Sequence, residues 1–387
     1  MAEDLLTKRS SIYSDRPQFH STMGTSDRLL GWANNTAVIS YGERWRTQRR
    51  MTHELLHKRA SEELSPLIVK NSRLALQRLL EEPDPVYGYE ATSSNDTLFE
   101  TVSCAVDGFS RSIIASNFYV NLIPWMQYIP AWFPGAQWKR KALVWRWQTE
   151  QMLHVPYNWT REKMGTGSAP PSMLRHILSK YVKEPSKEEK ETVLWAAGSL
   201  FAAGTDTTVS STLILIVAMA MYPEVQTKAQ AEVDSILCGN RFPEIEDQQS
   251  MPYVEAVIKE ALRWRSVLPL GVSHACIEDD DYKGYRIPKG AAIAMSFDER
   301  VYPNPECFDP SRFLDPSTPE APAFGFGRRG LFAFFDIRPK LDSEGRPIKL
   351  TAEMKQNISV SQPTAFEVDI KPRSKKHEQI LRSWVDV

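Results

Sequence analysis

Apolar residues recur with a helical period through much of the second half of the chain. After Pro223, the positions Val225, Ala229, Val233 and Ile236 fall on one face of a helix. Proline is favoured at the first position of a helix, because its missing N–H has no partner there in any case. The pattern therefore predicts an amphipathic helix that begins at Pro223.

The longest apolar stretch of the chain runs from Val193 to Met221. Its length alone would allow a membrane span. It carries Asp206 near its centre, together with threonines and serines, and such side chains are costly in hydrocarbon. We therefore expect a long buried helix, and Pro252 predicts a further helix over Tyr253–Arg265.

Strand patterns are few and come late in the chain. Tyr285–Ile287 lies between two Lys-Gly pairs, and Phe366, Val368 and Ile370 alternate with polar residues. The first half instead has helical patterns, among them an arginine-rich candidate over Tyr41–His57. The predicted fold class is mainly α with a minor β region.

The segment Val120–Pro134 is strongly apolar and aromatic, yet its prolines interrupt any regular helix. Segments of this kind lie on a membrane surface or border an apolar pocket. The alternative is that these side chains pack into the core, which is the usual place of aromatic residues. The sequence leaves both interpretations open.

Composition narrows the class of protein. The 387 residues include 42% hydrophobic and 25% charged residues, and the net charge of -1 gives no reason to expect a nucleic-acid partner. The four cysteines are scattered without a C-x-x-C pair, so neither a zinc site nor a disulfide framework is indicated. The polar start of the chain, Met1–Ser14, predicts no signal peptide or membrane anchor.

Two local patterns suggest chemistry. The run Ala203–Thr208 places a glycine and three threonines inside a helix, where they are poor formers. It indicates either a kinked core helix or a ligand site with a proton-relaying acid. Glu260 and Arg263 lie on one helix face, although the same spacing also occurs at Glu43 and Arg46.

The order of these patterns with the later runs Phe308–Phe313 and Phe324–Arg329 resembles the cytochrome P450 (haem-thiolate monooxygenase) family. The likeness extends from near Met1 to beyond Arg373 and implies the family's single, mainly helical haem-binding domain over residues 1–387. By this resemblance the proton-delivering catalytic residues are Asp206 and Thr207. The residues implied to bind the cofactor are Trp45, Arg49, Ala203, Gly204, His274, Phe324, Gly327 and Arg329. The residues implied to form a structural triad are Glu260, Arg263 and Arg312.

The sequence departs from the family pattern F-x-x-G-x-R-x-C-x-G after Arg329, because Leu331 occupies the cysteine position. No cysteine follows Arg329, so no iron ligand is predicted. We expect internal losses near 294 and after 329, and a start beyond the anchor and first strands of membrane-bound relatives. The family fold would then be incomplete.

Three functional interpretations follow. The favoured one is a fungal-type monooxygenase in incomplete form, inactive as written. In complete form it would insert oxygen into an apolar organic substrate, with electrons from NADPH-cytochrome P450 reductase. The second is a non-catalytic relative that binds an apolar small molecule, or a non-functional splice product, and the third is a helical scaffold unrelated to haem. The family implies the cytosolic face of the endoplasmic reticulum membrane, and the missing anchor implies a cytoplasmic chain with peripheral membrane contact.

Overall fold

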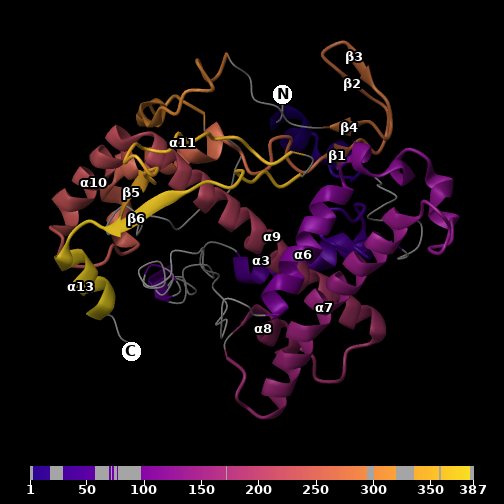
Figure 1. Cartoon of the computed structure of the whole chain (residues 1–387). Coiled ribbons are helices and arrows are strands. Elements are labelled where there is room, and N and C mark those ends of the chain that lie inside the picture. Colours follow the sequence, from indigo (N-terminus) through magenta and orange to yellow (C-terminus); the bar gives the residue numbers. More distant parts are fainter. Residues whose placement is uncertain are drawn as a thin grey trace.

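The computed structural model of the chain describes residues 3–17, 29–56, 69–70, 72–73, 76, 97–170, 172–293, 300–319, 335–356 and 359–383. Within these ranges the protein is helical over most of its length, with three small two-stranded antiparallel sheets (Figure 1). The predicted class, mainly α with a minor β region, is confirmed. The losses predicted near 294 and after 329 fall outside the described residues.

Helix α9, Lys187–Met221, is the long helix that the sequence predicts. It begins before the predicted Val193, because Ser186 and Glu189 form a capping box that satisfies backbone N–H groups at its start. Its length and composition alone would allow a membrane span. Other helices pack along both of its halves, and it runs between the two main cores of the protein (Figure 1).

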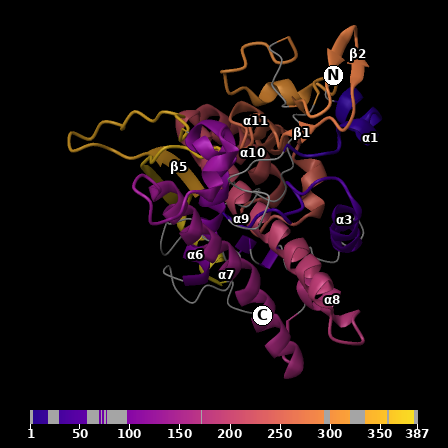
Figure 2. The same cartoon turned by 90° about the vertical axis from the view of Figure 1, so that its right-hand side faces the viewer.

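The first core surrounds the N-terminal half of α9 and includes Trp32, Trp145 and Leu153. The helices that build it are α6 (Thr97–Ser112), α7 (Gln137–Gly165), α8 (Met173–Ser179) and α9. Helices α6 and α7 lie side by side (Figure 2). Gly108 makes this approach possible, since a Cβ atom there would lie 2.5 Å from Cγ of Trp145.

The second core surrounds the C-terminal half of α9. Its other elements are α10 (Pro223–Leu237), α11 (Pro252–Trp264), β5 (Phe335–Pro339), β6 (Val368–Pro372) and α13 (Lys375–Ser383). The predicted apolar face of α10 is confirmed, because Val225, Ala229 and Val233 are all buried. Gln226 joins α10 to β5 by exchanging hydrogen bonds with both backbone groups of Ile337.

The N-terminal segment packs against the small sheets of the middle of the chain. Its helical turns are η1 (Glu3–Lys8) and α1 (Ser10–Tyr13), and the strands are β1 (His274–Ala275), β2 (Asp280–Tyr282), β3 (Tyr285–Ile287) and β4 (Ala292–Ile293). Arg9 and the hydroxyl of Tyr13 both donate to Asp280. Asp15 pairs with Ala275 in an antiparallel bridge, which places Arg16 beside the start of β1.

The apolar segment after α6 forms three short 3₁₀ turns, η2 (Ala115–Asn117), η3 (Tyr119–Asn121) and η4 (Pro124–Tyr128). Trp125 is 65% exposed and Trp132 79% exposed, so core burial is the wrong interpretation for these two side chains. Lys139 of α7 supports the segment by donating to the carbonyls of Gln127 and Ile129. The structure therefore displays large apolar groups at the surface here.

The remaining described helices connect these parts. The predicted arginine-rich helix is confirmed as α3 (Glu43–Leu56), which packs against α9. The short turns η5 (Glu246–Ser250) and η6 (Pro310–Leu314) both contact α11.

Candidate functional site

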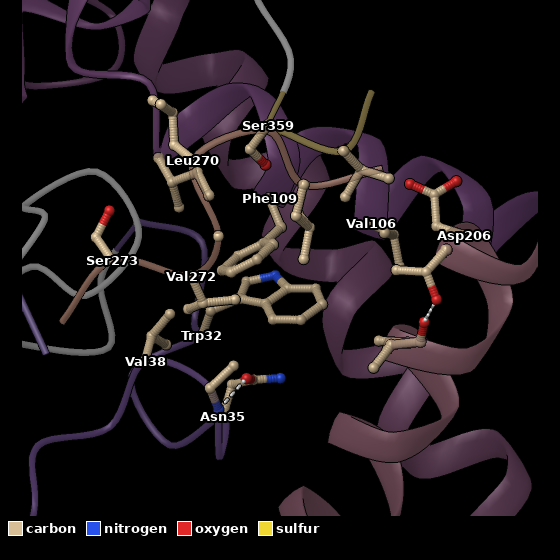
Figure 3. A pocket seen from close by; sticks show the side chains of 18 of the residues that line it. Trp32, Asn35, Val38, Val106, Phe109, Asp206, Leu270, Val272, Ser273 and Ser359 are labelled. Atoms are coloured by element: carbon tan, nitrogen blue, oxygen red, sulfur yellow. Dashed lines mark hydrogen bonds between the residues drawn. The ribbon is translucent and has the colours of Figure 1, made fainter. Parts of the chain in front are cut away.

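A cavity of about 500 Å³ lies beside the middle of α9 (Figure 3). This volume is in the range of small-molecule sites. Most of its lining is apolar and comes from distant parts of the sequence. The lining residues are Arg16, Pro17, Trp32, Asn35, Ala37, Val38, Val106, Phe109, Ile113, Ile114, Ser199, Ala202, Ala203, Asp206, Thr207, Leu268, Pro269, Leu270, Gly271, Val272, Ser273, Ser359 and Val360.

Two stacked aromatic rings form one wall of the cavity. The ring centroids of Trp32 and Phe109 lie 4.3 Å apart at an interplanar angle of 27° (Figure 3). Trp32 is almost fully buried and donates from Nε1 to Oγ1 of Thr149 at 2.8 Å, while Trp195 packs on it from α9. A ring held on several sides has few alternative rotamers, so this wall is preorganised for a ligand.

The unusual run in α9 stays helical, with no break at its glycine or threonines. Thr207 donates from Oγ1 to the carbonyl of Ala203 at 2.6 Å, and Thr205 does the same to Phe201. Such back-bonding satisfies a mid-helix hydroxyl. Ala203 and Thr207 both line the cavity, whereas Gly204 does not and faces open space.

Asp206 is the acid of the cavity wall. Gln362, from the segment before β6, donates from Nε2 to Oδ1 of Asp206 at 2.8 Å. Burial raises the pKa of Asp206, and the nearby Asp107 raises it further, while Gln362 and Lys355 act in the opposite direction. The structure thus places the predicted pair Asp206 and Thr207 at one cavity, and their proton-delivering role stays a prediction.

A group of basic side chains lies near the other side of the cavity. Arg16 lines the cavity and donates from Nη1 to the carbonyls of Val272 and Ser273, each at 3.1 Å. Burial lowers the pKa of Arg16 to about 10, and the charge of Arg49 also acts in this direction. Burial and the charge of Arg16 lower the pKa of His274.

The predicted residues Trp45, Arg49 and His274 do not line the cavity itself. The guanidinium of Arg49 lies over the ring of Trp45, 5.6 Å from its centroid. Arg16 is the functional candidate that sequence reasoning missed. Arg16 is an isolated arginine after a polar stretch, so it belongs to no sequence motif that would have singled it out. The bridge between Asp15 and Ala275 brings it to the cavity.

The predicted triad is assembled as a buried cluster. Both carboxylate oxygens of Glu260 accept from Arg263, at 2.7 and 2.9 Å, and Oε1 also accepts from Nε of Arg312 at 3.3 Å. The backbone N–H of Asp309 donates to the same Oε1 at 2.8 Å. Glu260 is fully buried, so the cluster ties α11 to the Asp309–Arg312 turn inside the protein.

Comparison of the sequence with known proteins identifies the family of the chain. The model of the family described as Cytochrome P450 matches residues 1–330. The chain is 35% identical to Cytochrome P450 monooxygenase COX2 of Coprinopsis cinerea, over 96% of the chain and 79% of that protein. The chain belongs to the cytochrome P450 family. Cytochrome P450 monooxygenase ple1 of Rhodocybe pseudopiperita is 36% identical, over 99% of the chain and 81% of that protein. Tryptamine 4-monooxygenase of Psilocybe cyanescens is 32% identical, over 98% of the chain and 83% of that protein.

The alignments with these cytochromes P450 contain gaps in this chain. The alignment with COX2 extends over 419 positions, more than the 387 residues available. The match to the family model ends at residue 330, next to the predicted junction after Arg329. The losses near 294 and after 329 stay predictions.

The cytochrome P450 family implies haem. The described residues suit the carboxylates of haem but not its iron. The basic side chains Arg16, Arg49 and His274 gather near the cavity and suit the carboxylates that haem carries. The donor chemistry for iron does not fit. All four cysteines precede Arg329, and the described part of the chain contains no cluster of His, Cys, Asp or Glu that could hold a metal.

Four residues of the predicted haem loop, Phe324, Gly327, Arg329 and Leu331, lie outside the described residues. The assignment of Leu331 to the cysteine position stays a prediction, and a leucine side chain has no lone pair to donate to iron. The described residues therefore supply a cavity with basic groups nearby, and the lack of a thiolate ligand stays a prediction.

Proposed function

We propose that this cytochrome P450-family chain binds an apolar small organic molecule in the cavity beside α9 and, in the form given by its sequence, does not insert oxygen into it. The cavity carries the proposal. It has the volume of a small-molecule site, an apolar lining and a rigid aromatic wall made by Trp32 and Phe109.

The second half of the proposal follows from the missing thiolate. In this family a cysteine thiolate bound to haem iron donates electron density that favours cleavage of the O–O bond. Leu331 stands at that position and supplies no such density. The relatives are named monooxygenases, so oxidation is the chemistry of the family. We infer that this chain keeps the binding step and lacks the oxidation step.

Asp206 and Thr207 place two polar side chains at the wall of the cavity. Burial raises the pKa of Asp206, so its neutral form is favoured more than that of an exposed aspartate. The hydroxyl of Thr207 is turned back to the carbonyl of Ala203. We propose that these groups orient a polar substituent of the bound molecule.

The test separates binding from oxidation. Naphthalene, as an apolar probe, should bind the purified full chain in a fluorescence titration. Ala203→Phe, which fills part of the cavity, should weaken that binding at least tenfold. Ala231→Phe, the same substitution on the exposed face of α10, should leave it unchanged. If both variants bind naphthalene equally well, the cavity beside α9 is not the binding site.

The same preparation should be supplied with haem, reduced and exposed to carbon monoxide. Absence of the long-wavelength absorption band of a thiolate-ligated carbonyl complex is the expected result. Appearance of that band would contradict the proposed lack of oxidation chemistry.

A second candidate is a complete monooxygenase of which this sequence is a shortened product. It is favoured by the intact triad around Glu260 and by the position of Asp206 and Thr207 at the cavity. Such a protein would receive electrons from NADPH-cytochrome P450 reductase. Sequencing transcripts across the codons for Arg329 and Gly330 tests it, since a cysteine-encoding insertion there would restore the enzyme.

We also propose peripheral contact with a membrane through the segment 119–133. Tyr119, Leu122, Trp125, Tyr128 and Trp132 are each more than 60% exposed. Lys139 and Arg140 adjoin the segment, because both donate to its backbone carbonyls, and their charge complements anionic lipid. Such contact would place the chain at the cytosolic face of the endoplasmic reticulum membrane.

Co-sedimentation with phosphatidylserine-containing vesicles tests this contact. Trp125→Ser combined with Trp132→Ser should move the chain to the supernatant. Leu341→Ser, which removes an apolar side chain that is 57% exposed in another region, should not. Sedimentation unaffected by the double substitution would exclude this segment as the contact.

A further inference from the structure

One side chain of the cavity wall presents a neutral hydrogen-bond donor in a fixed orientation. Asn35 lines the cavity and is only 4% exposed. Its amide oxygen Oδ1 accepts from the backbone N–H of Ala37 at 2.8 Å, in the turn that asparagine commonly forms with the residue two positions later. Of the two ends of the amide only the oxygen accepts, so this bond fixes which end is the nitrogen. Figure 3 shows the nitrogen Nδ2 on the side of the amide turned away from this bond.

The other hydrogen-bonding groups of Asn35 are satisfied within the protein. Its backbone N–H donates to the carbonyl of Trp32 at 3.0 Å, and its own carbonyl accepts from Val38 and Ile39 at 3.0 and 2.9 Å. Within the described part of the chain, Nδ2 has no acceptor. A buried amide nitrogen without a partner costs free energy, and a ligand that brings an acceptor removes this cost.

The loop that carries Asn35 is anchored on both sides of this residue. The carbonyl of Asn34 accepts from Nε2 of Gln48, a fully buried side chain of α3, at 2.9 Å. Thr36 donates from its hydroxyl to Oε1 of the same glutamine at 2.8 Å, and its backbone N–H donates to Oγ of Ser199 on α9 at 3.0 Å. Because α3 and α9 both hold the loop, the position of Nδ2 is set before any ligand enters.

Two hydroxyl groups of the lining differ from Asn35 in this respect. Thr207 donates to the carbonyl of Ala203, and the hydroxyl oxygens of Ser359 and Ser110 lie 3.0 Å apart in a hydrogen bond. These groups have partners inside the protein. The hydrogens on Nδ2 of Asn35 are left for a ligand.

We propose that the cavity selects an apolar molecule that carries a neutral carbonyl oxygen, with this oxygen accepting from Nδ2 of Asn35 and the apolar body against Trp32 and Phe109. Trp32 adjoins Asn35, since its carbonyl accepts from the backbone N–H of that residue, so one molecule contacts both the ring and the amide. This inference rests on the proposed function, because it names the class of molecule that the cavity takes and the residue that selects it.

The selection has a physical basis in the cost of an unmade hydrogen bond. A hydrocarbon of the same shape keeps the apolar contacts but covers Nδ2 without giving it a partner. Sites that are built to form a hydrogen bond reject molecules that lack the matching group for this reason. Since a neutral hydrogen bond has a modest net free energy, the expected difference in affinity is about three- to tenfold.

Two probes of nearly equal shape test the inference. Acetylnaphthalene has a carbonyl oxygen where isopropenylnaphthalene has a methylene group. Calorimetric titration of the full chain should show tighter binding of the ketone, by about three- to tenfold. Asn35→Leu, which keeps the side-chain volume without the donor, should make the two affinities equal, and so should Asn35→Ser, whose hydroxyl oxygen is able to accept from Ala37. Asn158→Leu, at an exposed asparagine of α7 outside the cavity, should preserve the difference.

The infrared carbonyl band of bound acetylnaphthalene gives a second readout. A hydrogen bond to the oxygen weakens the C=O bond, so the band should lie at a lower frequency than in cyclohexane. It should return toward the cyclohexane frequency in Asn35→Leu. An unshifted band in the unaltered chain would overturn the inference.

The outcomes separate this inference from the proposed function. Equal affinities of the two probes for the unaltered chain overturn the inference, and so does a ketone preference that survives in both Asn35 variants, because the donor is then another residue. If naphthalene binds and neither probe does, the inference is overturned and the apolar-ligand function stands. If none of the three binds, the proposed function itself is overturned. If neither variant folds, a shifted carbonyl band in the unaltered chain supports the inference and an unshifted one overturns it.

Discussion

Gln362 donates a hydrogen bond of 2.8 Å to the carboxylate of Asp206, so a residue near the C-terminal strand β6 holds the acid of the central helix α9. Lys355 in turn donates to Oε1 of Gln362 at 2.9 Å. The amide thus links a surface ammonium to a partly buried carboxyl group. This relationship joins residues separated by 156 positions in the sequence.

Gln362→Ala is expected to raise the pKa of Asp206 further above its ordinary value. The reason is that the hydrogen bond from Gln362 favours the ionised carboxylate, while burial and Asp107 oppose it. Carbon-detected NMR titration measures the pKa, with Asp206→Asn identifying the resonance. Gln249→Ala, an exposed glutamine of η5, is the control. A pKa that falls in Gln362→Ala would contradict the assignment.

Glu260→Gln is expected to lower the free energy of unfolding by about 3–5 kcal/mol, because it leaves Arg263 with an uncompensated buried charge. Denaturant unfolding measures this. Glu43→Gln is a matched control, since Glu43 also pairs with an arginine three residues later but on the surface. Little change is expected there. Equal effects at the two sites would show that the triad is not structural.

Gly108→Ala is expected to destabilise the protein by about 1–3 kcal/mol, because its Cβ would overlap the ring of Trp145 between α6 and α7. Gly204→Ala places the same methyl group in open space inside a helix. There it should stabilise by about 0.5–1 kcal/mol, since glycine loses more backbone freedom on folding. Thermal unfolding of the two variants compares them, and a stable Gly108→Ala would refute the close contact.

Acid sensitivity is expected from His274. Burial and Arg16 lower its pKa in the folded protein, so the unfolded chain binds the proton more readily as pH falls through about 6.5. Stability from this residue is therefore present at higher pH and is lost on acidification. His274→Asn should flatten the decline in unfolding free energy between neutral pH and about pH 5. His154→Asn, at an exposed histidine of α7, should retain the decline of the unaltered protein.

Periodicity recovered the helices whose apolar faces are regular. The face of α10 is buried as predicted, because a 3.6-residue repeat leaves one side of a helix apolar whatever it packs against. The start of α9 was placed too late, since the charged first turn has no apolar signal and depends on the capping box of Ser186 and Glu189. The exposure of Trp125 and Trp132 was beyond sequence reasoning, because composition does not say on which side of a segment the core lies.

By itself the sequence determined the family, the long central helix, the Glu260–Arg263 spacing and the absence of a cysteine after Arg329, since these depend on residue identity and local period. Only the tertiary structure decided that Arg16 enters the cavity, that Gln362 holds Asp206, and that Trp32 stacks on Phe109. Each of these contacts joins segments distant in the chain. Their partners are selected by the packing of the whole core, which no local pattern encodes.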